Sequence, residues 1–335
     1  MTVDLTTRYL GMTLRNPVVV SSCPLTGCLR TLERLEEAGA AAVVLPSLFE
    51  EQLEHESRQL HQLGEYGAEA HAEALHYFPP FEEYNQGTRE SLKHLEHAKR
   101  ALAIPVIASL NGVSPGGWVS YAKKIEEAGA DALELNIYFP VTDFETTSAE
   151  VESRYVDLVA AVRGATRLPL AVKIGPYFAA LPNVAKRLVD AGADGLVLFN
   201  RYLHPDIDLE RLELALEMDV SSRSEMRLPL RWIGILRGPL SVSLAATSGV
   251  HSGGDVLKLL LAGADVAMIA SVLLQRGPHY LAEVVSEIRS WLERREYESV
   301  AQMKGTMSRN HVPNREAYER ANYVKTLIAY TSKMP

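Results

Sequence analysis

Residues 168–178 read LPLAVKIGPYF, an apolar run that follows a proline and carries a lysine near its end. A short run of Leu, Ala, Val and Ile is typical of a buried parallel strand. Because an unpaired ammonium group is costly to bury, Lys173 needs a partner at the end of this strand. Two interpretations are open: Lys173 reaches solvent or a carboxylate, or it is a cation aimed at a ligand that carries or develops negative charge.

The run at 168–178 belongs to a repeat of two alternating phrases. The first is a proline with an apolar run, found as NPVVVSS from Asn16, IPVIASL from Ile104, LPLAVKI from Leu168 and GPLSVSLAAT from Gly238. The second is Ala-Gly-Ala followed by an apolar run, which begins at Ala38, Ala128, Ala191 and Ala262. We interpret each Ala-Gly-Ala as a helix end that glycine stops before the next strand begins.

Helical patterns separate most of these apolar runs, at 120–127, 151–163, 183–190 and 255–261. Eight parallel strands that alternate with helices predict an α/β fold of the (β/α)8 type, a TIM barrel. A doubly wound open sheet is the alternative, although it does not account for eight evenly phrased units.

Two segments interrupt the repeat. Residues 48–103, between the second and third runs, are too long for one crossover and form an acidic, histidine-rich insertion. Its part from His76 to Gly87 is aromatic and proline-rich and is interpreted as a loop over a site. A metal cluster is the alternative for these histidines, but their spacing is irregular and we expect no metal.

The tail at 277–335 looks helical and should pack outside the barrel. We therefore expect one domain over 1–335, with the barrel core at about 16–280 and C-terminal helices at 281–335.

Composition narrows the class of protein. The chain has 335 residues, 47% of them hydrophobic, and a net charge of −8, which argues against a nucleic-acid surface. The most apolar stretch, at 256–274, contains Lys258 and Asp265 and is not a membrane span. With no signal peptide in the sequence, a cytoplasmic location is expected. Cys23 and Cys28 are expected to be buried thiols rather than a redox pair.

The active site of such a barrel lies at the carboxyl ends of its strands. The residues at those ends are Ser21, Ser22, Pro46, Ser47, Asn111, Asn136, Lys173, Asn200, Thr247, Ser248, Gly249, Ala270 and Ser271. This set holds no Asp/Glu pair and no Cys/His pair, which disfavours a glycosidase, a metal hydrolase and a nucleophilic hydrolase. Amide side chains both donate and accept, which suits a ring with carbonyl and N–H groups, such as a flavin or a pyrimidine.

Residues 247–255, TSGVHSGGD, follow the seventh strand and precede a helix. Glycines and small residues let backbone N–H groups approach a phosphate, and the helix dipole favours the anion. A phosphate site after strands seven and eight recurs in barrels of this type. The stretch therefore predicts a phosphate-binding loop.

Together these motifs resemble the class 1 dihydroorotate dehydrogenases, which are FMN-dependent barrels of pyrimidine synthesis. The matching segments are LRNPVVVSS, ELNIYFP, AVKIGPYF, DGLVLFN and TSGVHSGGDVLKLLLAGADVAMIAS. The resemblance implies that Lys173 lies beside the flavin pyrimidine ring and stabilises reduced flavin. It implies that Asn136 and Asn200 face flavin and substrate, and Asn136 joins Lys173 as a catalytic candidate. The other implied FMN contacts are Ser21, Ser22, Ser47, Asn111, Ser222, Ser248, Gly249, Ala270 and Ser271. A cytosolic homodimer without the membrane helix of the class 2 enzymes is also implied.

The sequence departs from the family pattern at the reacting end. Phe139 stands at the position of the family's catalytic cysteine, Val141 replaces the following asparagine, and Pro46 replaces a lysine. His76, also a candidate for binding substrate, and Asp143 could supply a base instead. Three functions stay open: oxidation of dihydroorotate to orotate, a flavin reductase or electron-transfer module for another small substrate, and a barrel that binds a phosphorylated ligand without redox chemistry.

Overall fold

The computed structural model describes residues 3–49, 88–111, 115–138, 140–201, 205–215 and 219–318, with residues 323 and 328. Eight parallel strands close into a barrel. They are β3 (Val18–Val20), β4 (Ala42–Phe49), β5 (Val106–Asn111), β6 (Ala132–Asn136), β7 (Leu170–Ile174), β8 (Gly195–Leu198), β11 (Ser243–Ala246) and β12 (Val266–Ile269). Neighbouring strands follow chain order, and β12 pairs with β3 to close the ring. The predicted (β/α)8 barrel is confirmed, and the open sheet is excluded.

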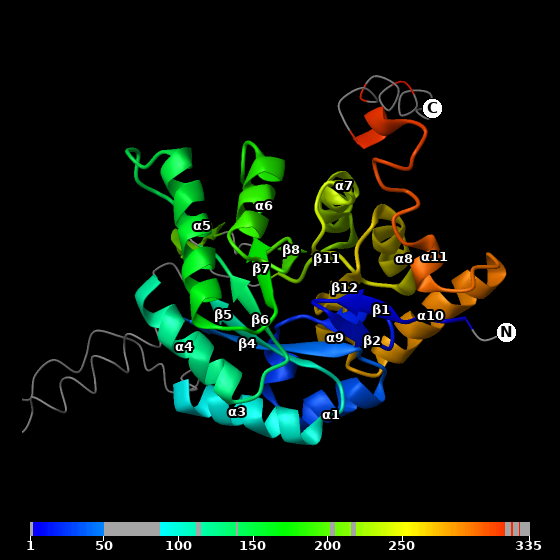
Figure 1. Cartoon of the computed structure of the whole chain (residues 1–335), viewed down its shortest axis with the longest axis horizontal. Coiled ribbons are helices and arrows are strands. Elements are labelled where there is room, and N and C mark those ends of the chain that lie inside the picture. The colour runs from blue at the N-terminus through cyan, green and yellow to red at the C-terminus, as the bar shows by residue number, and fades with distance from the viewer. Residues whose placement is uncertain are drawn as a thin grey trace, which may run out of the picture.

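Helices surround the barrel, as Figure 1 shows. They are α1 (Leu29–Glu37), α3 (Thr88–Ala101), α4 (Pro115–Glu127), α5 (Ser148–Ala165), α6 (Leu181–Asp190), α7 (Arg227–Leu236) and α8 (Gly253–Ala262). The four predicted helices are confirmed as α4, α5, α6 and α8, although α4 begins at Pro115 rather than at residue 120. Proline is tolerated in the first turn of a helix, where its missing N–H has no partner in any case. The Ala-Gly-Ala phrases end helices as predicted, because Gly39, Gly129, Gly192 and Gly263 all adopt positive φ.

The alternation of side chains along β7 decides where Lys173 points. Leu170, Val172 and Ile174 pack in the apolar layer between the barrel and the helices. Ala171 belongs to a second apolar cluster inside the barrel. Successive side chains of a strand point to opposite faces, so Lys173 faces the barrel interior with Ala171.

An N-terminal hairpin, which the sequence did not predict, fills the end of the barrel at which the parallel strands begin. It consists of β1 (Thr7–Tyr9) and β2 (Met12–Leu14), paired antiparallel. Tyr9, Leu10 and Leu14 join the apolar cluster inside the barrel. This end is therefore closed by apolar packing, and the polar side chains of the interior gather at the carboxyl ends of the strands.

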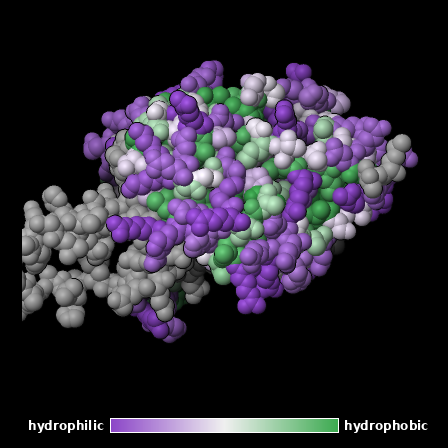
Figure 2. All heavy atoms as spheres, turned by 60° about the horizontal axis from the view of Figure 1, so that its bottom comes forward, coloured by the Kyte–Doolittle hydropathy of each residue, from purple (hydrophilic) through white to green (hydrophobic). Residues whose placement is uncertain are grey.

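The C-terminal segment contains the predicted helices, with turns at 304–314 between the last two of its described elements. Its helices are α9 (Ser271–Arg276), α10 (Tyr280–Arg294), α11 (Val300–Met303) and the 3-10 turn η4 (Arg315–Tyr318). Helix α10 packs against α8 on the outside of the barrel (Figure 1). Among the described helices, none is long and apolar enough to cross a membrane. On the face shown in Figure 2, hydrophilic side chains cover most of the surface and apolar ones form scattered patches.

A second hairpin follows β8 and was also not predicted. Strands β9 (Asp206–Asp208) and β10 (Glu213–Ala215) pair antiparallel. The chain then reaches the 3-10 turn η3 (Arg223–Met226), which leads directly into α7. Residues 219–221, shortly before η3, return to the rim of the barrel and contribute to the site described below.

Candidate functional site

A cavity of 380 Å³ opens at the carboxyl ends of the barrel strands. Each of the eight strands contributes a lining residue at its end or just beyond it: Ser21, Phe49, Asn111, Asn136, Lys173, Asn200, Thr247 and Ala270. The volume is within the range of about 300–1,000 Å³ that is usual for ligand sites. The fold thus brings residues from the whole length of the chain to one hollow.

Three polar side chains line up across adjacent strands on one side of this cavity. In the strand register Asn111 lies beside Asn136, and Asn136 lies beside Lys173. All three are at most 8% exposed. Register neighbours in a parallel sheet share a face, so the two amides and the ammonium group form one row inside the barrel.

Asn136 has an unused acceptor. Its Oδ1 atom is buried and has no hydrogen-bond partner among the described residues. A buried polar atom without a partner costs about 1–3 kcal/mol, so the arrangement favours a ligand that supplies an N–H donor. The ring N–H groups of a flavin or of a dihydropyrimidine supply such a donor.

Lys173 has a carboxylate partner deeper in the barrel. Its Nζ atom lies 3.3 Å from Oε1 of Glu134, which is fully buried. The other carboxylate oxygen of Glu134, Oε2, has no partner among the described residues. The pair answers the question that the sequence left open: Lys173 has a carboxylate partner and also lines the cavity.

The predicted phosphate loop faces this row across the cavity. Ser248 and Gly249 have φ values of 79° and 71°, so the chain turns with two successive left-handed residues. A Cβ atom on Gly249 would lie 2.5 Å from the backbone nitrogen of Met226 and 2.7 Å from the carbonyl oxygen of Ser222. Only glycine fits this close approach of two backbone segments.

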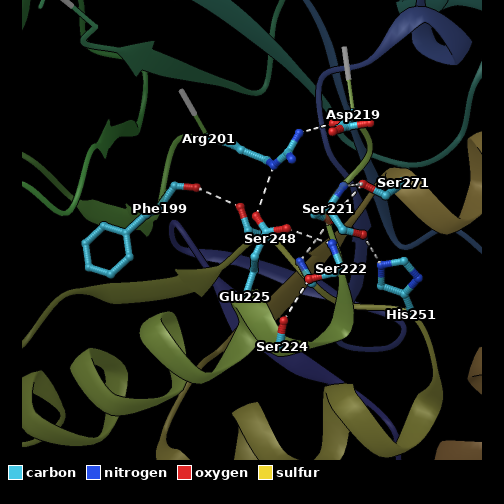
Figure 3. Close-up of polar contacts among 11 residues, drawn as sticks. Phe199, Arg201, Asp219, Ser221, Ser222, Ser224, Glu225, Ser248, His251 and Ser271 are labelled. Carbon is cyan, nitrogen blue, oxygen red and sulfur yellow. Dashed lines mark hydrogen bonds and ion pairs between the residues drawn. The ribbon is translucent and has the colours of Figure 1, made fainter. Parts of the chain in front are cut away.

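Ser221 connects this loop to the start of α9 (Figure 3). Its hydroxyl lies 2.8 Å from the Ser271 hydroxyl and accepts a hydrogen bond from the Gly249 N–H at 3.1 Å. Its carbonyl oxygen lies 2.7 Å from Nε2 of His251. The phosphate loop, the start of α9 and the segment before η3 are therefore held as one unit.

Helix α8 begins at this unit with a polar cap. Ser252 accepts a hydrogen bond from the backbone N–H of Asp255, and Arg223 donates to both carboxylate oxygens of Asp255. Burial raises the pKa of Asp255, but the hydrogen bonds from Arg223, Ser252 and the His251 N–H outweigh it and hold the pKa below its ordinary value. The negative charge of Asp255 lies in the first turn of α8, where the helix dipole also favours it.

Arg201 lies over the cavity mouth, beside Phe199 and the phosphate loop (Figure 3). It donates to Glu225 at 3.0 Å and to the carbonyl oxygen of Asp219. Arg201 and Asp219 both line the cavity, and no motif in the sequence indicated either of them. They lie in the connection between β8 and α7, whose path no local pattern predicts.

Most residues that the sequence proposed for the site come together in this cavity. Those that line it are Ser21, Ser22, Asn111, Asn136, Lys173, Asn200, Ser248, Gly249, Ala270 and Ser271. Ser47 instead lies 2.7 Å from the hydroxyl of Ser109, and Ser222 caps η3 next to the lining residue Ser221. His76 and Phe139 lie outside the described residues. Within the described part of the chain, His, Cys, Asp and Glu form no group of three suited to a metal ion.

Comparison with known proteins decides the family. A family model described as dihydroorotate dehydrogenase matches residues 83–292. The chain is 32% identical over 214 residues to the putative dihydroorotate dehydrogenase A (fumarate) of Aeropyrum pernix, spanning 62% of this chain and 69% of that protein. It is 27% identical over 297 residues to the catalytic subunit of dihydroorotate dehydrogenase B (NAD(+)) of Methanocaldococcus jannaschii, spanning 86% and 94% of the two chains. The chain belongs to the dihydroorotate dehydrogenase family.

The resemblance to the class 1 dihydroorotate dehydrogenases is thereby confirmed, and the chain is an oxidoreductase of this type. The residues that line the cavity fit a flavin cofactor. The orphaned Asn136 oxygen can accept a hydrogen bond from a ring N–H, and the Lys173 ammonium in the same cavity can meet developing negative charge.

Cys23 brings a thiol into the cavity of this dehydrogenase. It is half-buried and free, and it lines the cavity beside Ser22. Burial raises the pKa of the Cys23 thiol, while hydrogen bonds from the backbone and the charge of Lys173 lower it in part. Cys28 is exposed, so the expectation that both thiols are buried is wrong for Cys28, which lies at the outward-facing start of α1.

Proposed function

We propose that this protein is an FMN-dependent dehydrogenase that oxidises dihydroorotate to orotate in pyrimidine biosynthesis. The observation that carries the proposal is the row formed by Asn136 and Lys173 facing the Ser248–Gly249 loop across one cavity. Such a site can hold a ring with alternating N–H and carbonyl groups at one side and a phosphate at the other. The names of the relatives, both dihydroorotate dehydrogenases, support the same substrate.

The chain's own residues divide into two groups in this proposal. Ser248, Gly249, Ala270 and Ser271 hold the FMN phosphate, with their backbone N–H groups as donors. Ser21, Ser22, Asn111 and Lys173 hold the ring, and Asn136 and Asn200 bind the carbonyl and N–H groups of the substrate. Bound FMN supplies the hydride acceptor. The positive charge of Lys173 lies where the reduced ring gains negative charge.

Oxidation of dihydroorotate also releases a proton, which a base on the protein must accept. Phenylalanine at position 139 has no acceptor atom. Lys173 and Arg201 line the cavity as cations and are not counted as proton acceptors. Among the other described residues that line it, the side chains able to accept a proton are those of Cys23, Tyr138 and Asp219. We assign the role to Cys23, because its half-buried thiol lines the cavity beside Ser22, whereas Asp219 is exposed.

A flavin reductase or electron-transfer module that acts on another small substrate is the second candidate. The sequence at Phe139, Val141 and Pro46 favours it, since all three positions depart from the family pattern at the reacting end. The names of the relatives specify two different electron acceptors, fumarate and NAD(+), so the acceptor of this chain is an independent question.

Two measurements test the proposal. The purified protein is expected to be yellow, with one FMN bound non-covalently, and stopped-flow mixing with dihydroorotate is expected to bleach the bound flavin. Bleaching by another reductant but not by dihydroorotate would favour the second candidate. A colourless protein that takes up no FMN on reconstitution would remove both and leave a barrel that binds a phosphorylated ligand without redox chemistry. We also propose a cytoplasmic homodimer, which sedimentation velocity tests.

A further inference from the structure

A second cavity, of 840 Å³, lies at the N-terminal end of the barrel. Its walls come from the turn of the β1–β2 hairpin, the end of α5 and the segment at 238–243 between α7 and β11. It shares no lining residue with the cavity at the carboxyl ends of the strands. The two cavities therefore lie at opposite ends of the barrel, and the proposed chemistry does not use this one.

Arginine dominates the charge of this cavity. Four arginines line it, Arg8, Arg163, Arg167 and Arg237, against two aspartates, which leaves a formal charge of +2. Lys304 adds a further cation, since its Nζ atom lies 2.6 Å from Oδ1 of one of those aspartates, Asp265. The whole chain carries a net charge of −8, so the positive charge of this cavity is opposite in sign to the charge of the protein as a whole.

A structural role accounts for two of the four arginines. Arg163 lies 3.0 Å from Asp194, and Asp194 also accepts a hydrogen bond from the first residue of β7. Arg237 lies 3.2 Å from Asp265, which accepts a hydrogen bond from the second residue of β11. These pairs brace the starts of barrel strands, as expected for residues at the N-terminal face of such a barrel.

Arg8 and Arg167 have no such role. Both are exposed, and neither forms an ion pair within 4.0 Å among the residues that the structure describes. Arg167 does act on Glu126: hydrogen bonds from Thr166 and from the Arg167 N–H lower the pKa of the Glu126 carboxyl, and the charge of Arg167 lowers it further. They approach the cavity from separate elements, β1 and the link between α5 and β7. A guanidinium group presents a planar fork of donors that matches a phosphate or a carboxylate. Two guanidinium groups without a close ion pair, both on the wall of one cavity, are suited to a ligand with more than one anionic group.

We propose that this cavity binds a small polyanion, a phosphorylated or polycarboxylated metabolite, at a site separate from the flavin site. Arg8 and Arg167 supply the direct contacts, and the paired Arg163 and Arg237 raise the local positive potential. The hairpin residue Leu10, together with Leu240, gives the hollow an apolar wall against which the body of the ligand packs. The proposal does not depend on the reaction at the other end of the barrel.

The test is isothermal titration of the full chain, with FMN present in excess so that its phosphate site is filled. Pyrophosphate and citrate serve as the two probes, at constant ionic strength. The wild type is expected to bind at least one of them, and the double variant Arg8→Ala/Arg167→Ala is expected to bind it at least tenfold more weakly. Preference for one probe identifies the anionic group as phosphate or carboxylate.

The matched control is Arg154→Ala. Arg154 is also exposed and lies on α5, nine residues before Arg163, about 14 Å away along the helix. This variant is expected to bind the probe as the wild type does, and both variants should keep wild-type FMN binding and thermal unfolding. Failure of the wild type to bind either probe, or equal binding by the double variant, would overturn the proposal.

Discussion

Lys173 Nζ lies 3.3 Å from Glu134 Oε1 inside the barrel, and both side chains are buried. Removing one partner of a buried ion pair leaves an uncompensated charge and typically costs about 3–5 kcal/mol. We therefore expect Lys173→Met to lower the free energy of unfolding of the FMN-free protein by this amount. Urea unfolding of the FMN-free proteins measures it, because bound ligand would add its own stabilisation.

The control is the double variant Lys173→Met/Glu134→Leu, in which both charges are replaced by apolar groups. It is expected to recover most of the lost stability, since an apolar pair is often as stable as a buried ion pair. Additive effects of the two single changes would show that the pair does not interact.

The same pair predicts opposite shifts of the flavin potential. Lys173→Gln removes a positive charge beside the ring and is expected to lower the two-electron midpoint potential, whereas Glu134→Gln removes the opposing negative charge and is expected to raise it. A shift of about 30 mV corresponds to about 1.4 kcal/mol. Spectroelectrochemistry of the FMN-loaded variants measures both. Shifts of the same sign would contradict a direct electrostatic effect.

Alanine substitution at two glycines near the predicted phosphate loop is expected to have different effects on FMN binding. Residue 249 has a positive φ, and Gly249→Ala would place a Cβ atom 2.5 Å from the backbone nitrogen of Met226. Relieving this clash would require the backbone to move. This variant is expected to lose FMN affinity at least tenfold. In Gly254→Ala the new Cβ lies 3.6 Å from the Ser252 hydroxyl, within the first turn of α8. That control should bind FMN normally and gain about 0.5–1 kcal/mol of stability. Fluorescence titration of FMN compares the two.

Much of the barrel could be predicted because its elements are local. The Ala-Gly-Ala phrases and the apolar runs place each strand, and the rim of a closed parallel barrel then brings their ends together. Asn136 and Lys173 were found in this way. Glu134 could have been found too: it lies two residues before Asn136 on the same strand, so both face the interior.

What the sequence could not provide depends on contacts between distant segments. Ser47 falls at a strand end, but the register between β4 and β5 shifts between Val44 and Ser47, and its hydroxyl contacts Ser109 instead. Arg201 and Asp219 reach the cavity through an irregular connection. Arg8 and Arg167 come together only through the tertiary fold. No spacing of residues along the chain predicts these contacts between distant segments.

Asp255 predicts part of the acid sensitivity of the fold. Its pKa is held below the ordinary value, so it contributes stability above the unfolded pKa and loses it as the pH falls through the folded pKa. Asp255→Asn is expected to cost about 1–3 kcal/mol at pH 7, from lost hydrogen bonds to a buried group. Below about pH 4 the variant should lose less further stability than the wild type. Urea unfolding at both pH values measures this, and parallel pH profiles would rule out the role of Asp255.

The proton acceptor gives the last prediction. A positioned base is typically worth about 10²–10⁴-fold in rate, and only the thiolate form of Cys23 can act as one. Because burial raises the pKa of this thiol, the rate of flavin reduction by dihydroorotate should be low at neutral pH and rise as the pH increases. Cys23→Ala is expected to reduce the rate at alkaline pH at least 10²-fold and to flatten its pH profile.

Stopped-flow reduction of the bound flavin at a series of pH values measures this, with Cys28→Ala as the matched control. Cys28 is exposed outside the cavity, so its loss should change neither the rate nor the profile. Phe139→Cys should raise the neutral-pH rate only modestly, since Val141 and Pro46 also differ from the family pattern. If Cys23→Ala keeps the wild-type rate and profile while Asp219→Asn loses the rate, the base is the carboxylate at the cavity mouth, and the thiol has only a packing role.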